Sequence, residues 1–319
     1  MNTILVTGAT GAVGPTLVTH LLANGYKVRT YSRSVSQQLP EEVDQRQGDL
    51  LDRRALSAAL EGVSIVFHLA AMLHIENPSS ELAEEYERVN VLGTRALAEN
   101  AVTARVKRIV YFSTVKVYGI HQYPPLSEDD PTAPTTVYAR TKLQGEYEVT
   151  KVKDIETVIL RLSAVYGPRL RGAWARLIKA VRRRWFLPVG DLNNRRSLTY
   201  VEDVARAALL VAQHPQSAGH IYNVVGHPSP MQREIMIAIY SACGQRLPRL
   251  HIPGGLAHLG AGLLEMTCTA FGKCSPITPE MINQFIEDET YSGEALSSLG
   301  FIPSVSLEEG WQLTLELMT

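Results

Sequence analysis

The sequence lacks a strong net charge and a metal-binding arrangement of cysteines. Its 31 Lys and Arg residues nearly balance 32 Asp and Glu residues, which leaves a formal net charge of −1. No global field would therefore attract nucleic acid or an anionic membrane. The three cysteines have no metal-ligand spacing, which favours a reducing cytoplasm. His68, His74 and His121 have no partner spacing that indicates a metal either, so we expect core or loop histidines, no metal and a cytoplasmic protein.

A signal peptide and a clear membrane span are also missing. Met1 leads almost directly into a strand-like run, with no basic region before it. The stretch 254–272 is apolar and nearly long enough to span a bilayer, but it contains His258, Glu265 and several small residues. We interpret it as a buried or partly amphipathic helix, with membrane association as the less favoured alternative.

What the sequence does contain is an alternation of strand-like and helical segments. The predicted strands are Ile4–Thr7, Lys27–Tyr31, Ser64–Leu69, Arg108–Ser113 and Thr157–Leu162. The predicted helices are Val13–Asn24, Arg53–Glu61, Glu81–Thr103 and Val137–Lys151. Strands separated by helices of this length imply right-handed crossovers and a parallel sheet covered on both faces. The fold class is α/β, a Rossmann-type doubly wound parallel sheet.

After residue 167 the alternation becomes irregular and proline-rich. We expect residues 1–167 to form an NAD(P)-binding Rossmann domain, whose sheet also takes later elements from about 197–226. Residues 168–319 then form mainly a smaller, loop-rich substrate-binding region, with two further short helices between residues 279 and 319.

The first strand is followed by a glycine-rich turn and then a helix, which is the context that a dinucleotide-binding fingerprint requires. Its glycines permit a tight turn and let the backbone approach a pyrophosphate at the helix N-terminus. The residues of this turn that we expect to bind the cofactor are Gly8, Thr10, Gly11, Ala12, Val13 and Gly14.

The end of the second strand bears on the choice of cofactor. An NAD site usually has an acid there for the ribose 2′-hydroxyl, but this chain has Arg33, whose guanidinium suits a 2′-phosphate. NADP(H) is therefore favoured over NAD(H). Further cofactor contacts are expected from residues that end the next two strands, namely Asp49, Leu50, Leu69, Ala70 and Ala71.

Tyr138 and Lys142 form a YxxxK pair whose side chains share one helix face. A lysine cation beside a tyrosine favours the phenolate and lowers its pKa, which makes the phenol a usable acid/base catalyst. Thr114 ends the fifth strand, so its hydroxyl can meet Tyr138 at the carboxyl edge of the sheet. The three residues predict a catalytic set, with Tyr138 and Lys142 also touching the cofactor.

As a set, the motifs of this chain resemble those of the extended short-chain dehydrogenase/reductase family, which includes nucleotide-sugar epimerases, dehydratases and reductases. The motifs, over nearly the whole chain, are TGATGAVG (7–14), HLAA (68–71), NVLGT (90–94), FSTVKVYG (112–119), YARTK (138–142), LRLSAVYGP (160–168), RSLTYVED (196–203) and LGFIP (299–303). The resemblance implies that Thr114, Tyr138 and Lys142 are catalytic and that Asn90 faces the active site, where we expect it to bind the cofactor. It also implies a homodimer formed through the helices 81–103 and 137–151.

Departures from the family pattern narrow the chemistry. Val115 and Lys116 stand where the dehydrating members carry an Asp-Glu pair, so elimination of water is not expected. Ala164 replaces an Asn that binds substrate in many sugar-nucleotide members. Arg196 matches an arginine that contacts substrate phosphate; the alternative is a structural salt bridge with Glu202 or Asp203.

Ala164, Arg169 and Arg196 are accordingly the expected substrate-binding residues. The resulting prediction is an NAD(P)-dependent oxidoreductase/epimerase that acts on a nucleotide-activated sugar, by 4-epimerisation or 4-keto reduction. Two alternatives stay open: a 3β-hydroxysteroid dehydrogenase-like or other ketone reductase, which Ala164 would suit, and a non-enzymatic NADP-sensing regulator.

Overall fold

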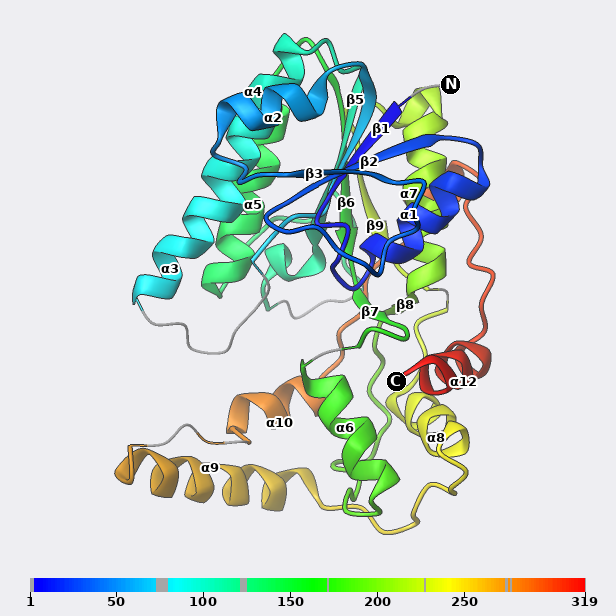
Figure 1. The fold of residues 1–319 in the computed structure, drawn as a ribbon. Coiled ribbons are helices and arrows are strands. Elements are labelled where there is room, and N and C mark those ends of the chain that lie inside the picture. The colour runs from blue at the N-terminus through cyan, green and yellow to red at the C-terminus, as the bar shows by residue number, and fades with distance from the viewer. Residues whose placement is uncertain are drawn as a thin grey trace. The chain divides into compact units, whose positions relative to one another are not determined.

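The computed structural model describes residues 3–72, 80–120, 125–170, 172–226, 228–272, 275 and 277–318. His74 and His121 lie outside these ranges. The chain divides into two compact units (Figure 1). Unit 1 consists of Met1–Val165, Thr199–Gly226 and Ser292–Ser304, and unit 2 of Tyr166–Leu198, His227–Tyr291 and Val305–Thr319. The chain leaves unit 1 within β7 (Ala164–Tyr166) and returns to it within β8 (Leu198–Tyr200).

Unit 1 is built on a seven-stranded parallel sheet with the strand order β3-β2-β1-β4-β5-β6-β9. Its strands are β1 (Thr3–Thr7), β2 (Lys27–Ser32), β3 (Asp44–Gln47), β4 (Val63–His68), β5 (Arg108–Thr114), β6 (Glu156–Leu162) and β9 (Ile221–Val224). Every residue of β5 is buried, as expected for a central parallel strand with both faces covered. The predicted doubly wound α/β fold is confirmed.

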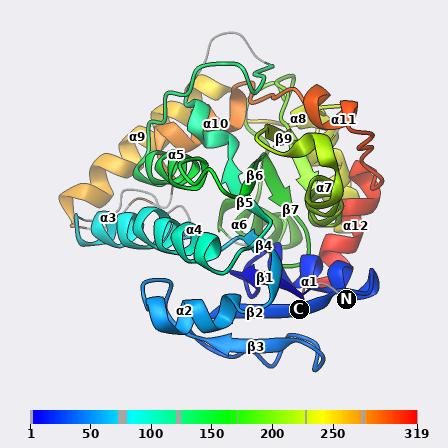
Figure 2. The ribbon, with the colours of Figure 1, turned by 90° about the horizontal axis from the view of Figure 1, so that it is seen from above.

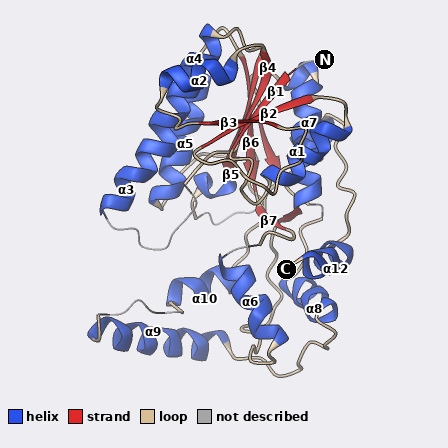
Figure 3. Ribbon diagram, in the orientation of Figure 1, coloured by secondary structure: helices blue, strands red, loops and turns tan. Residues whose placement is uncertain are grey.

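Helices cover both faces of this sheet (Figures 2 and 3). One face carries α1 (Gly14–Ala23) and α7 (Val201–Gln213), which pack against each other. The other face carries α2 (Arg53–Leu60), α4 (Thr94–Thr103) and α5 (Val137–Thr150). Two of these helices begin at side-chain caps: the Asp52 side chain accepts the amides that start α2, and the Thr136 hydroxyl accepts one at the start of α5.

The predicted helix Glu81–Thr103 is not one regular helix. It consists of α3 (Ser80–Glu87), a π-helical turn η1 (Arg88–Gly93) and α4. The Thr94 hydroxyl donates to the Asn90 carbonyl at 2.7 Å, and such back-bonding competes with the regular helical ladder. The irregular turn was not visible in the apolar pattern, and it holds Asn90, one of the predicted site residues.

Unit 2 contains the helices α6 (Gly172–Arg182), α8 (Gln232–Ala242), α9 (Gly254–Ala270), α10 (Pro279–Ile286) and α12 (Leu307–Leu317). The fully buried Trp311 ring stacks on Tyr166 at 4.6 Å and lies 5.4 Å from Trp174. The tail beyond residue 278 has three helices rather than the predicted two. The additional one is the five-residue α11 (Glu294–Ser298), which belongs to unit 1.

The helix α9 differs from the prediction that it is buried or partly amphipathic. Of its side chains only Ala261 is buried, while Leu259 is 63% and Met266 64% exposed. The reason is that α9 packs on α10 through small residues and turns its large apolar ones outward. Within the described part of the chain, no helix is long and apolar enough to cross a membrane.

Candidate active site

The glycine-rich turn between β1 and α1 allows backbone contacts that a side chain would prevent. Gly8 has φ +69°, and a Cβ there would lie 2.6 Å from the Ala70 nitrogen, which follows β4. A Cβ on Gly14 would lie 2.4 Å from the Ala9 carbonyl carbon. The turn is closed by the Gly11 amide, which donates to the Gly8 carbonyl at 3.0 Å. The end of β1 and the segment after β4 therefore meet at one point of the sheet edge.

The N-terminus of α1 fits an anionic group. Its N-cap residue Val13 makes no side-chain hydrogen bond to the helix amides, so the first turn keeps amides that a pyrophosphate can accept from. Thr10 and Ala12 are exposed in the same turn, and Gly11 is half-buried. The predicted glycine-turn residues thus lie together, in the strand–turn–helix arrangement that a dinucleotide requires.

The segment after β4 is held against this turn and against α5. The Leu69 amide donates to the Thr7 carbonyl at 3.2 Å, and the Ala70 amide to the Thr7 hydroxyl at 3.2 Å. Beyond Ala71, the Asn90 side chain accepts the Met72 amide at 2.8 Å. The structure therefore brings the predicted residues 69–71 and Asn90 to the same carboxyl edge of the sheet.

Asn90 also reaches across to the helix that carries Tyr138 and Lys142. Its buried side-chain nitrogen donates to the Thr141 hydroxyl at 3.1 Å. Asn90 thus joins the segment after β4 to α5, and its amide is occupied by protein partners on both sides. This is a positioning contact, supplied by the π-helical turn η1.

The residues at the ends of β2 and β3 also lie together. The buried Tyr31 donates to the Asp49 carbonyl at 2.8 Å, and the Asp49 carboxylate receives Arg88 at 2.8 Å. The Leu51 amide, followed by Arg88 and Arg33, holds the pKa of Asp49 below its ordinary value. Arg33 itself is exposed, whereas Leu50 packs on the core of unit 1.

His68 is a structural residue at the end of β4. Its fully buried ring hydrogen-bonds the Thr7 hydroxyl at 2.6 Å and the Thr94 hydroxyl at 3.0 Å. Burial lowers the pKa of His68 to about 3, helped by the charge of Lys142, so the ring is neutral at physiological pH. Among the described residues, no three His, Cys, Asp or Glu side chains are arranged to hold a metal ion.

Thr114 and Tyr138 meet at the carboxyl end of β5. Thr114 is buried at the last position of the strand, and Tyr138 is the second residue of α5. Burial raises the pKa of Tyr138 to about 12, while a side-chain hydrogen bond with Thr114 opposes the rise. The Tyr86 ring lies 6.4 Å from the Tyr138 ring in an edge arrangement.

The largest influence on the pKa of Tyr138 is its own burial, which acts against the lowering that we expect from Lys142. Lys142 is 2% exposed, and its Nζ lies 4.0 Å from the centre of the Tyr111 ring. Burial lowers the pKa of Lys142 to about 7, with Glu146 opposing this shift. Desolvation therefore dominates at both groups: it disfavours the phenolate of Tyr138 and the ammonium of Lys142 alike.

A buried ion pair beneath Lys142 was not anticipated from the sequence. Glu146, one turn after Lys142, receives Arg161 of β6 at 2.8 and 3.1 Å and the Ser113 hydroxyl of β5. Both charged side chains are 4% exposed, and the Arg161 guanidinium lies 4.8 Å from the centre of the Tyr118 ring. In the sequence, Glu146 resembles an ordinary acidic residue on the surface of a helix. The signal that could have indicated the pair is Arg161, a charged residue inside an otherwise apolar strand.

The substrate residues predicted from the resemblance lie in different units. Ala164 begins β7 in unit 1, and Arg169 belongs to unit 2. Arg196, also in unit 2, pairs with Glu289 at 2.7 Å and donates to the Gln284 carbonyl.

The salt bridge considered for Arg196 is therefore real but has a different partner. Glu202 instead hydrogen-bonds His20 at 2.9 Å, and Asp203 pairs with Arg206 at 2.7 Å. Both acids start α7 in unit 1.

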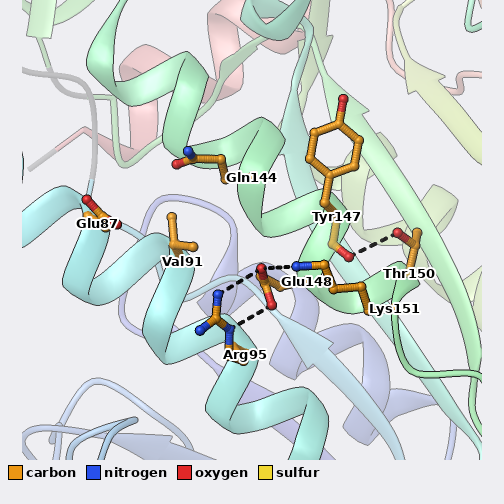
Figure 4. Close-up of a pocket in the computed structure, with 8 residues that line it drawn as sticks. All are labelled: Glu87, Val91, Arg95, Gln144, Tyr147, Glu148, Thr150 and Lys151. Carbon is orange, nitrogen blue, oxygen red and sulfur yellow. Dashed lines mark hydrogen bonds and ion pairs between the residues drawn. The ribbon is translucent and has the colours of Figure 1, made fainter.

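A pocket of about 490 Å³ lies elsewhere, along α5 and the helix η1–α4 (Figure 4). Glu148, Arg95 and Lys151 line this pocket, and the Glu148 carboxylate pairs with Arg95 at 2.8 Å and with Lys151 at 2.6 Å. The remaining residues that line it are Glu87, Val91, Gln144, Tyr147 and Thr150. None of the predicted site residues lines this pocket.

Comparison with known proteins places these features in a family context. Residues 4–225 match the sequence model of the NAD dependent epimerase/dehydratase family. A UDP-glucose 4-epimerase from Vibrio cholerae is 30% identical to this chain. The alignment covers 98% of this chain and 94% of that protein. The sterol demethylase protein B of Methylococcus capsulatus is 34% identical to this chain. That alignment covers 82% of this chain and 81% of that protein.

Among solved structures, the chain resembles MoeE5 in complex with UDP-glucuronic acid and NAD. The two share a TM-score of 0.77 and 29% sequence identity, over 99% of this chain and 98% of that one.

The buried ion pair generates a stability prediction. Glu146→Gln leaves the Arg161 guanidinium buried without a counter-charge, so the free energy of unfolding should fall by about 3 kcal/mol. Glu99→Gln, which removes an exposed partner of Arg53, should change it by less than about 1 kcal/mol. Urea denaturation followed by circular dichroism measures both. An equal, small effect of the two substitutions would show that the pair does not anchor α5.

Proposed function

This chain belongs to the NAD-dependent epimerase/dehydratase family, and we propose that its substrate is a nucleotide-activated sugar, epimerised at C4 or reduced from a 4-keto form. As a family member with the Tyr/Lys pair, it is an enzyme of the short-chain epimerase/reductase type rather than a non-enzymatic regulator. The observation that carries the proposal is the meeting of Thr114 and Tyr138 at the carboxyl end of β5, at the sheet edge that holds the glycine turn.

We assign the proton to the Tyr138 phenol. A nicotinamide cofactor held at the glycine turn would supply the hydride for the carbonyl carbon of a keto sugar. The carbonyl oxygen takes the proton of the Tyr138 hydroxyl, which a pKa of about 12 keeps protonated at neutral pH. The Thr114 hydroxyl orients that oxygen and then stabilises the phenolate. Lys142, with a pKa of about 7, can carry a proton toward or away from this pair near physiological pH.

Dehydration is not part of the proposal. Elimination of water needs an acid and a base beside the threonine, but Val115 is a buried apolar residue and Lys116 carries no carboxylate. The remaining chemistry at the site is hydride and proton exchange at one carbon. Epimerisation is two such exchanges on opposite faces of the sugar, and reduction is one.

A sterol or simple ketone is the second candidate substrate. Ala164 places no amide where many sugar-nucleotide members have Asn, and the likeness to the sterol demethylase protein B favours an apolar substrate. Against it stand the likeness to the UDP-glucose 4-epimerase and to MoeE5, whose structure contains UDP-glucuronic acid.

For the cofactor we propose NADP(H) in preference to NAD(H). The support is the exposed Arg33 after β2 and the pairing of Asp49 with Arg88. The cofactor named in the MoeE5 structure is NAD, which supports the nicotinamide class but not the preference for NADP.

We further propose a cytoplasmic homodimer that associates through α5 and the helix η1–α4. The support for the interface is the pocket between these helices and the half-exposed Tyr147 on its rim. The support for the location is that Cys243 and Cys268 are free thiols.

The mechanism predicts that Tyr138→Phe lowers turnover by about a hundredfold or more, because the proton donor is lost. Cofactor affinity, measured by fluorescence titration of the reduced nicotinamide, should change by less than about twofold. Tyr147→Phe, an exposed phenol on the same helix, is the matched control and should leave both unchanged. Full turnover in Tyr138→Phe would refute the assigned acid/base.

The cofactor preference predicts that Arg33→Ala weakens NADP(H) binding by about tenfold, because a charge-assisted hydrogen bond to the 2′-phosphate is lost. NAD(H) binding should not change. Arg53→Ala removes another exposed arginine of unit 1 and should affect neither cofactor. Calorimetry measures the affinities of the variants for both cofactors. An equal loss of NADP and NAD affinity in Arg33→Ala would remove the basis for the preference.

The substrate class predicts that one nucleoside diphosphate stabilises the cofactor-loaded protein. At about a hundred times its dissociation constant, a ligand raises the free energy of unfolding by about 2.7 kcal/mol. UDP, dTDP, GDP and CDP are titrated by thermal shift. Arg196→Ala should weaken the effect, and Arg195→Ala, its neighbour, should not. No stabilisation by any of the four would move the assignment to the sterol or ketone substrate.

A further inference from the structure

The helix α9 of unit 2 has its two faces reversed relative to a surface helix of a water-soluble domain. Large apolar side chains point to solvent, where the most exposed are Leu256, Leu259, Leu263 and Met266, with Phe271 just after the helix at 80%. Surface helices normally direct such residues into the core and charges outward. Leu259, Leu263 and Met266 follow each other at helical spacing and form one continuous stripe.

The opposite face of α9 carries small and polar residues and packs on the protein. Ala261 is buried with Val189 and Ile282, and Ala257 is packed against the same cluster. His258 hydrogen-bonds the Asn283 side chain at 2.9 Å. The only acid of the helix, Glu265, lies on this half-buried face. The outward surface of α9 therefore exposes Thr267 and Thr269 beside its apolar side chains but no charged residue, and the orientation of α9 is determined by contacts on its other side.

Basic side chains gather near the N-terminal end of α9. The segment 245–252 runs beside the end of α6: Gln245 donates to the Val181 carbonyl at 2.9 Å, and the Gly190 amide donates to the Ile252 carbonyl at 2.9 Å. These contacts bring together exposed arginines from both segments. They are Arg182, Arg183, Arg184, Arg246 and Arg249.

The five arginines of this basic cluster outnumber the acids beside them, Glu308 and Glu316, which line a pocket together with Arg182, and the cluster includes an exposed aromatic ring. Neither the stretch 169–190 nor the stretch 245–264 contains an Asp or a Glu. Trp185 is 79% exposed and lies under the Arg183 guanidinium at 5.6 Å, and Leu250 is 78% exposed. The net charge of −1 for the whole chain thus conceals a strongly positive local surface.

We propose that α9 lies in the headgroup region of an anionic phospholipid bilayer, with its outward apolar stripe among the acyl chains. An apolar helix face combined with arginines and a tryptophan is the combination that binds lipid interfaces. The apolar stripe supplies the burial, and the cluster of arginines meets the anionic headgroups. The helix lies on the bilayer and does not cross it.

The charge argues for a lipid surface rather than for a second copy of this chain. Packing two α9 stripes together would bring two clusters of arginines into proximity with fewer acids than arginines to neutralise them. Anionic headgroups neutralise the same arginines. The exposed Trp185 also finds at an interface both apolar and polar surroundings, which suit its indole ring.

The test uses the full-length chain and vesicle flotation, without cofactor or substrate, so that its outcome is independent of the proposed reaction. The unaltered chain should float with vesicles of phosphatidylcholine and phosphatidylglycerol at 70:30 and bind pure phosphatidylcholine more weakly. Arg183→Gln, Arg246→Gln and Arg249→Gln should each weaken binding to the anionic vesicles by about fivefold. Failure of the unaltered chain to bind either vesicle overturns the proposal.

Substitutions on the stripe test the apolar contribution. Leu259→Glu with Leu263→Glu should lower the partition coefficient by more than about tenfold. Leu259→Asn with Leu263→Asn, which adds no charge, should also lower the partition coefficient. The control is Ile237→Glu with Leu317→Glu, two exposed apolar residues of α8 and α12 in the same unit, and it should bind like the unaltered chain. Thermal unfolding verifies that all variants are folded.

Vesicle binding that survives both α9 double substitutions overturns the proposal. Light scattering supplies the remaining outcome. If the α9 substitutions dissociate an oligomer of a chain that does not bind vesicles, the stripe joins two copies and the lipid assignment is wrong. Tyr147→Glu, placed on the proposed α5 dimer face, separates that interface from α9, because it should dissociate the dimer without changing vesicle binding.

Discussion

The ion pair between Glu146 and Arg161 is the constraint on which the active site depends. It joins α5 to β6 inside the protein, and the Ser113 hydroxyl adds β5 to the same contact. Because α5 is tied to the sheet at this depth, Tyr138 begins the helix beside Thr114, and Lys142 is held one turn above a buried carboxylate. A buried pair contributes little net stability compared with apolar packing, but loss of either partner is costly. The role of the Glu146–Arg161 pair is to specify the position of α5 on the sheet.

Around that anchor, the carboxyl edge of the sheet is assembled by contacts between segments far apart in the sequence. The glycine turn fits against the segment after β4 because Gly8 has no side chain. Asn90 then links that segment to α5, through Met72 on one side and Thr141 on the other. The same burial that positions these groups sets their protonation. It raises the pKa of Tyr138 and lowers the pKa of Lys142, so the Tyr138 side chain is a neutral phenol and Lys142 an amine close to its titration point.

The two units differ in how much of them could be predicted. The strands and helices of unit 1 follow from periodicity, since β-branched runs alternate with helical stretches, the first of which ends before Gly25, and the predicted sheet is confirmed. In unit 2 the prolines and short segments contain no such repeat. The stretch 254–272 was expected to be buried or partly amphipathic because apolar content alone does not indicate which face of a helix has a partner. That depends on α10, which contacts the small Ala257 and Ala261 and the polar His258 of α9.

The sequence by itself determined the class of the protein: the spacing of the glycine turn, the strand that ends in Thr114 and the YxxxK pair are local patterns, and local patterns can be read without coordinates. Tertiary structure alone decided what surrounds them. Glu146 resembles any exposed helix acid until Arg161 is found against it, and Arg196 found its partner in Glu289 rather than in the acids next to it in the sequence. The sequence predicts that Lys142 lowers the pKa of Tyr138, whereas burial acts in the opposite direction and raises it. Desolvation depends on every group packed around an atom, and that environment exists only once the chain has folded.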